Sequence, residues 1–246
     1  MRQKILLVYG IAAALCLCGC GEKTAEEALL KAESYARSGN WKTALKAAEK
    51  AAALEPKNPT ALMFLALVCE KNNLLDRALD SARHAATLEP DNFHTQYILG
   101  RLYAQDPSRQ TEAFKALYRA FRLRPQSTEA LILLTNTAMQ LNSPMAYTFL
   151  MELRKRPDFT IDATFSNELG IAYLRKKNFT AAQNELFRAC SSKDPKIILN
   201  TAIFLDRYRT SKSNARNFYS YYLNVVGNKP ADAAKRELVE ARMRQL

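Results

Sequence analysis

Small and apolar residues recur along this chain with a period of 34 residues, and polar residues fill most of the positions between them. Each of the two best-matched units closes on a proline, where a helix must stop. The pairs that share the period are Ala44 with Ala78, Ala51 with Ala85, Leu54 with Leu88, and Pro56 with Pro90. Self-similarity at this spacing is typical of stacked helix–turn–helix units. The pattern predicts an all-α array, which is an architecture for binding rather than for catalysis.

The two ends of the array carry their own signals. Thr24-Ala25-Glu26-Glu27 has the pattern of a capping box, so we expect the first helix to begin at about residue 25. Near the other end, Pro230 suits the first turn of a last helix. A solenoid needs a solvated end helix, and we expect one over residues 228–246. Its predicted apolar stripe consists of Ala234, Leu238 and Ala241.

From residue 25 onward the sequence resembles the tetratricopeptide repeat (TPR) family, which places small residues where two helices cross closely. In the first unit these residues are Ala32, Ala44 and Ala51, with Trp41 at a packing position and Pro56 at the end. The resemblance implies a right-handed α-solenoid of about six TPR-like helix–turn–helix repeats and a C-terminal capping helix. The array spans residues 25–227, and its repeats cover 25–58, 59–92, 93–127, 128–162, 163–195 and 196–227. The fourth and sixth repeats follow mainly from the phase of the others.

Two glycines test this alignment independently. Gly100 and Gly170 fall at the same helix-crossing position of the third and fifth repeats. A glycine inside a helix costs roughly 1 kcal/mol relative to alanine, so a packing reason is expected. Close approach of the paired helix supplies that reason, and we predict tight contacts at both positions.

The first 19 residues resemble the signal peptide of a bacterial lipoprotein. Arg2 and Lys4 precede an uncharged apolar segment over residues 5–17, which is too short to span a bilayer comfortably. Leu17-Cys18-Gly19-Cys20 then resembles a lipobox. The resemblance implies cleavage after Gly19 and lipidation of Cys20, and residues 20–24 form a short tether. A plain secretory signal is the alternative.

Localisation follows from the same resemblance. In lipoproteins of this kind, absence of aspartate directly after the acylated cysteine accompanies export to the outer membrane, and here that position is Gly21. We therefore expect a bacterial envelope protein that is lipid-anchored in the outer membrane and faces the periplasm.

Charge is uneven along the chain. The net charge is +12, and residues 131–246 contribute 18 basic and 10 acidic side chains. A basic face can meet nucleic acid, anionic lipid or an acidic protein surface. It can equally be a solvated face, which is the interpretation we favour because no block of five like charges occurs. We do not expect a nucleic-acid partner.

The sequence carries no pattern of catalytic or metal-ligating residues. Its two histidines, His84 and His94, belong to different repeats, with no ligand at suitable spacing. Cys69 and Cys190 lie in distant repeats, so we expect small buried residues and no disulfide between them. We predict a non-enzymatic protein with no metal, no cofactor and no small-molecule substrate.

The TPR resemblance implies that the first helix of each repeat lines a concave groove. Such a groove holds a peptide or a helix, and its Asn and Arg side chains favour polar backbone and acidic groups. Leu29 and Glu33 replace the Lys and Asn that chaperone-tail clamps use, so that sub-type is rejected. The predicted groove residues are Met63, Leu67, Tyr97, Arg101, Asn136, Asn167, Arg175, Asn200 and Arg207.

Several functions are compatible with this layout. The favoured hypothesis is a membrane-anchored scaffold that binds protein partners during envelope assembly. The arrangement of a lipobox and about six repeats also resembles the type IV pilus lipoproteins that pilot a secretin. An adaptor for cell-wall hydrolases, or a periplasmic chaperone, is a further alternative. The last alternative is direct binding of nucleic acid or lipid through the basic C-terminal half.

Replacing Cys20 with serine removes the thiol to which the lipid is attached. We expect Cys20→Ser to abolish membrane attachment, because the predicted lipid is joined to the protein through this thiol. Fractionation of cells into soluble and membrane pools measures this outcome. An unchanged membrane fraction would refute the lipobox interpretation.

Overall fold

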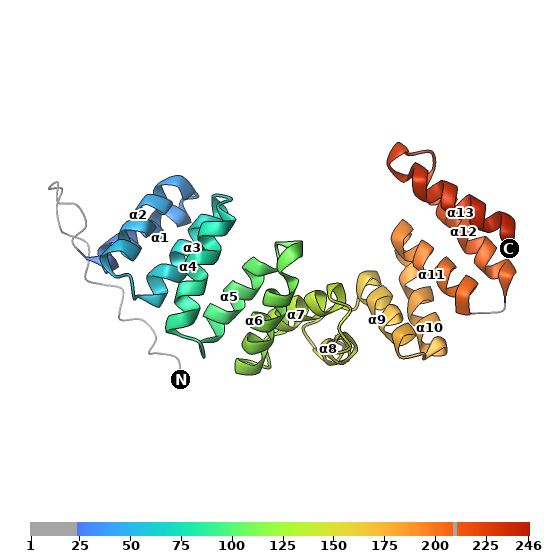
Figure 1. Ribbon diagram of the computed structural model, residues 1–246, viewed down its shortest axis with the longest axis horizontal. Coiled ribbons are helices and arrows are strands. Elements are labelled where there is room, and N and C mark those ends of the chain that lie inside the picture. The colour runs from blue at the N-terminus through green and yellow to red at the C-terminus, as the bar shows by residue number, and fades with distance from the viewer. Residues whose placement is uncertain (1–23, 209–210) are drawn as a thin grey trace, which may run out of the picture. The chain divides into compact units, whose positions relative to one another are not determined.

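The computed structural model describes residues 24–208 and 211–246, and the predicted signal peptide and Cys20 lie outside them. All regular structure in these ranges is helical, as predicted (Figure 1). None of the described helices is long and apolar enough to cross a membrane. The chain divides into two compact units, residues 1–90 and 91–246.

The first unit contains two helical hairpins. Its helices are α1 (Ala25–Arg37), α2 (Trp41–Leu54), α3 (Pro59–Lys71) and α4 (Leu75–Leu88). The predicted capping box begins α1, because the Thr24 hydroxyl accepts a hydrogen bond from the Glu27 N–H at 3.1 Å. The Asn58 side chain caps α3 in the same way, with Pro59 in its first turn. Local sequence signals therefore determine where these helices start.

The second unit holds the remaining helices in the same alternating arrangement. Three short 3₁₀ segments, Pro107–Arg109, Cys190–Ser192 and Pro230–Asp232, lie between them. The α-helices are α5 (Phe93–Tyr103), α6 (Gln110–Leu123), α7 (Thr128–Gln140), α8 (Ala146–Leu153), α9 (Ala163–Arg175), α10 (Phe179–Ala189), α11 (Pro195–Tyr208), α12 (Lys212–Val226) and α13 (Ala233–Gln245).

The small residues of the repeats lie where the predicted pattern needs them. Ala32, Ala44 and Ala48 are fully buried and pack together with Val68 of α3. In the second unit, glycine takes this role. A Cβ atom on Gly100 would lie 2.6 Å from Leu117 Cγ and 2.9 Å from the Leu117 backbone nitrogen, and one on Gly170 would lie 2.8 Å from Leu186 Cγ. The predicted tight contacts are confirmed.

Four of the hairpin turns contain a residue in the left-handed region. Gly39 (φ 76°) occupies this position between α1 and α2. Asn73, Asn142 and Lys177 adopt φ values of 59°, 52° and 58° in the turns that follow α3, α7 and α9. Asparagine tolerates this region better than most residues, so only one of the four turns needs glycine.

The fourth repeat departs from the others, which explains its weak pattern. Its second helix, α8, has only eight residues. Buried Phe149 of α8 packs against three aromatic rings of α6, those of Phe114, Tyr118 and Phe121. The α8 helix is thus packed on α6 through aromatic rings. The segment after α8 is held by Arg156, which donates to the Pro125 carbonyl at 2.7 Å.

One prediction about the last helix was wrong. Leu238 of the expected stripe is 71% exposed, and Ala234 is exposed as well. The residue of α13 that is buried is Val239, at 5% exposure. The helix is therefore rotated by about one residue from the expected phase: Val239, Met243 and Leu246 face the core, and Arg242 is bonded to α11 as described below.

Gly100→Ala tests the close crossing of α5 and α6. Alanine normally favours a helix over glycine by roughly 1 kcal/mol. Here the new methyl group would meet the Leu117 backbone, which cannot move aside, so we expect a loss of about 1–3 kcal/mol. Chemical denaturation measures it. The control is His94→Ala at an exposed position of α5, which should leave stability unchanged or slightly higher. Equal losses of stability in the two variants would contradict the packing argument.

Candidate functional site

Two asparagines join neighbouring first helices in the second unit. The Asn200 Nδ2 group of α11 donates a hydrogen bond to Asn167 Oδ1 of α9 at 3.0 Å. Asn167 is buried, and its own Nδ2 donates to Glu168 Oε1 at 3.4 Å. Asn200 is only half-buried. A carboxamide has two donors and two acceptor lone pairs, and this bond uses one donor of Asn200. Asn167 thus orients Asn200 at the surface.

Other predicted groove residues lie on the same series of first helices. Asn136 is exposed on α7, and Arg175 and Arg207 are exposed at the ends of α9 and α11. Arg175 donates to Asn142 Oδ1 in the turn after α7. We call Asn136, Asn167, Arg175, Asn200 and Arg207 the polar first-helix face.

Tyr97 and Arg101 lie on α5, where packing explains the tyrosine. The Tyr97 ring stacks on Phe93 with 5.6 Å between centroids, and it contacts the central core cluster of the unit. The Arg124 guanidinium lies 4.0 Å above the Phe93 ring. Arg101 is half-buried. Tyr97 is therefore chiefly part of the packing of the second unit.

Met63 and Leu67 belong to the first unit. Both are on α3 and both are half-buried. At the end of the same helix, the Asn72 side chain donates to the Trp41 carbonyl at 2.9 Å, and Lys71 Nζ lies 5.8 Å from the Trp41 ring. These contacts join the start of α2 to the end of α3.

A buried carboxylate that sequence reasoning missed ties the last three helices together. Asp206 of α11 is 7% exposed and pairs with Arg242 of α13 through two bonds of 2.7 and 2.9 Å. It also accepts from Lys212 Nζ and from the Tyr219 hydroxyl, both at 3.1 Å. The only signal in the sequence was an acidic residue in an apolar stretch, which does not reveal partners up to 36 positions away.

The electrostatics of this cluster follow from its contacts. The Arg242 guanidinium, with smaller effects from Lys212 and Tyr219, holds the pKa of Asp206 well below its usual range despite burial. Burial and the nearby Asp206 carboxylate raise the pKa of Tyr219 to about 12. All the charged partners are engaged with one another, so the cluster stabilises the fold and offers no group for a reaction.

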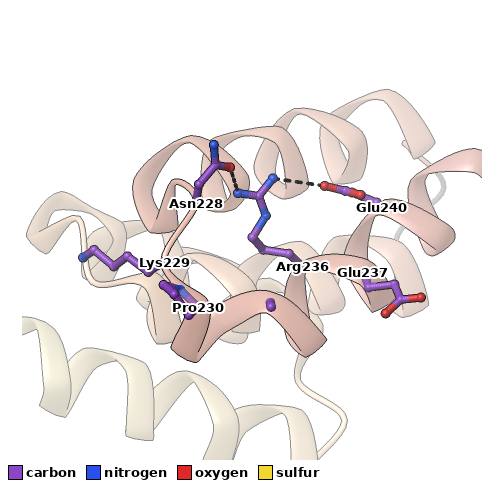
Figure 2. Close-up of a pocket in the computed structure, with 7 residues that line it drawn as sticks. Asn228, Lys229, Pro230, Arg236, Glu237 and Glu240 are labelled. Carbon is purple, nitrogen blue, oxygen red and sulfur yellow. Dashed lines mark hydrogen bonds and ion pairs between the residues drawn. The ribbon is translucent and has the colours of Figure 1, made fainter.

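A shallow cavity of about 280 Å³ lies where α13 begins (Figure 2). Arg236 extends across it and donates to Gly227 O, Asn228 Oδ1 and Glu240 Oε1. The guanidinium that lines the cavity thus bonds to the chain itself. The lining residues are Asn228, Lys229, Pro230, Ala233, Arg236, Glu237 and Glu240.

Candidate reactive groups are dispersed in the described part of the chain. No set of three or more His, Cys, Asp or Glu residues is placed there to hold a metal ion. Cys69 and Cys190 are both free thiols, as expected. Cys69 is buried but Cys190 is only half-buried, with its Sγ 3.2 Å from Thr201 Oγ1. Burial raises the pKa of both thiols, which disfavours the reactive thiolate.

Comparison with known proteins supports the repeat assignment. Residues 29–93 match the sequence model of the tetratricopeptide repeat family. No curated protein matches this chain. The match covers the first two predicted repeats, and the rest of the described chain continues as a succession of helical hairpins.

Solved structures resemble the chain along most of its length. The TPR protein YrrB, described as having an unusual peptide-binding site, is 15% identical, with a TM-score of 0.65 over 82% of this chain and 100% of that chain. PilF from Pseudomonas aeruginosa is also 15% identical, with a TM-score of 0.60 over 89% and 97%. PilW, a type IV pilus biogenesis factor, is 16% identical, with a TM-score of 0.57 over 85% and 97%. At these identities the likeness concerns the fold.

Asp206→Asn should destabilise the protein near neutral pH by about 2 kcal/mol. This is less than the 3–5 kcal/mol of a fully buried pair, because the side chains of Arg242 and Lys212 remain 42% and 50% exposed. A carboxylate whose pKa is lowered in the folded state contributes its full stability at pH values above its pKa in the unfolded chain, which is about 3.9. That contribution is lost as the pH falls toward the folded-state pKa. Urea denaturation at pH 7 and pH 2.5 should show the wild-type advantage shrinking in acid. A constant difference would contradict this account.

Proposed function

We propose that this chain is a non-enzymatic, membrane-anchored scaffold that binds another protein of the bacterial cell envelope. The fold supports the binding role, because a TPR-type array uses its apolar surface to stack repeats and presents the remaining helix faces to partners. The sequence around Cys20 supports the anchor. The outer membrane, facing the periplasm, is the proposed location, and it rests on Gly21 after the lipobox.

The orientation of Asn200 by buried Asn167 carries the proposal. The hydrogen bond between them holds one carboxamide at a defined angle on the polar first-helix face. A carboxamide matches the donor and acceptor of a peptide bond, so the oriented side chain of Asn200 suits the backbone of an extended or helical segment. Asn136 on α7 adds a further exposed carboxamide to the same series of first helices.

The charge of this face suggests the chemistry of the partner. Arg175 and Arg207 end their helices with exposed guanidinium groups. Guanidinium groups bind carboxylates through charge-assisted, often bidentate hydrogen bonds. We therefore infer a partner segment that carries Asp or Glu beside the stretch that lies on the asparagines.

Asn200→Ala tests the binding role in the native membrane. Removing the oriented carboxamide should weaken capture of the partner several-fold, because one hydrogen bond contributes about 0.5–1.5 kcal/mol. Crosslinking of intact cells, followed by affinity purification and mass spectrometry, identifies and quantifies the captured proteins. Asn184→Ala is the matched control, since Asn184 is exposed on the second helix α10. Equal capture by both variants would count against the first-helix face.

A second candidate is the piloting of a pilus secretin. It is favoured by the likeness to PilF and PilW over 97% of each of those chains. In this case the captured protein is the secretin, and loss of the chain should shift the secretin from a multimer to a monomer on a denaturing gel. An unchanged secretin multimer, together with capture of a different protein, would exclude the secretin-pilot function. That result would still agree with the general scaffold function.

A further inference from the structure

We propose that the outer face of α2 contacts the anionic headgroups of the membrane that holds the lipid anchor. The face consists of Lys42, Lys46 and Lys50, and we call it the α2 lysine face. The choice of a membrane as the occupant rests on the anchor proposed at Cys20. The chemistry that recognises this face is a layer of lipid phosphates.

Charge in the first unit is concentrated on one helix. α1 carries three acidic and two basic residues, and α3 and α4 each carry equal numbers of both. α2 carries three lysines and a single acid, Glu49. It is thus the one positively charged helix of this unit, although the charge of the N-terminal half as a whole is nearly balanced. Only the arrangement of the helices shows that this charge shares a surface.

Helix geometry turns the lysines away from the core. Ala44, Ala48 and Ala51 of α2 are fully buried against the neighbouring helices. Lys42 and Lys46 are exposed on the opposite side, one turn apart, and Lys50 is half-buried at the next turn. Glu49 forms an ion pair with Arg77 of α4, so its charge is already matched.

The hairpin brings one end of α2 back to the start of the array. Ala28 of α1, Ala51 of α2 and Ala61 of α3 pack together, which places the last turns of α2 beside the first turn of α1 (Figure 1). Leu54 is 43% exposed at this end, and Lys57 is exposed just beyond it. Between Cys20 and α1 the chain has four residues, which span at most about 14 Å. A lipid at Cys20 would therefore hold this end within reach of the headgroups.

The short lipid tether and the α2 lysine face would act together to hold the protein on the membrane. Basic residues near an anionic leaflet add attraction that falls off within a Debye length of the surface. A face as close as this one lies inside that range. Contact along α2 would hold the first hairpin in one orientation on the bilayer, instead of leaving it free to turn about the tether.

Vesicle binding by the unacylated mature chain tests the face separately from the anchor. The protein is residues 20–246 with Cys20→Ser, and the vesicles contain phosphatidylcholine with or without 30% phosphatidylglycerol. At low salt we expect binding to the anionic vesicles only. The triple variant Lys42→Gln, Lys46→Gln, Lys50→Gln should bind roughly 100-fold more weakly. Replacing the same lysines with arginine should preserve binding.

The matched control removes three exposed lysines elsewhere, with Lys115→Gln, Lys196→Gln and Lys235→Gln. Its binding should stay close to that of the unsubstituted chain. Equal losses in both triple variants would overturn the proposal, because binding would then follow net charge alone. Absence of binding to anionic vesicles, or binding to a DNA duplex in preference to them, would also overturn it. The anchor is tested separately, by fractionation of Cys20→Ser cells in a high-salt buffer that screens the attraction of the lysine face.

Discussion

The structure depends on the close crossing of two helices within each repeat. This crossing is possible only where the side chain is a methyl group or a hydrogen atom. Fully buried Ala44 and Ala78 serve the first two repeats, and Gly100 and Gly170 serve two later ones. Dense packing at these points lets dispersion and apolar burial hold a hairpin that would be marginal alone. Within each of the two units, neighbouring hairpins then bury further apolar side chains against each other.

Stacking of this kind leaves polar surfaces for recognition. The inner sides of the helices are occupied by packing, and Phe149 and Tyr97 both serve that purpose. The surface left over carries scattered apolar side chains such as Leu54 and two sets of polar side chains. On α9 and α11 they are carboxamides linked to each other, and on α2 they are lysines. These two surfaces differ in chemistry, which suits them to a peptide backbone and a lipid headgroup respectively.

Local signals made most of the fold predictable. The caps at Thr24 and Asn58 lie next to the helices they begin, and the small residues follow a strict period in the first two repeats. Prediction was weakest where distant contacts replace the local rule. In the fourth repeat, buried Phe149 packs against aromatic rings of the preceding repeat. In the last helix, the bonds from Arg242 to Asp206 set a rotation that the apolar pattern of α13 alone did not indicate.

The sequence by itself determined the class of fold, the order of the hairpins and the places where backbones approach closely, because each depends on residues near one another in the chain or on a repeating period. Tertiary structure decided which polar groups meet. Asn167 and Asn200 are 33 positions apart, and Asp206 and Arg242 are 36 apart. Such pairs depend on how successive hairpins are rotated against each other. That rotation results from the packing of many side chains together, so no single sequence motif predicts it.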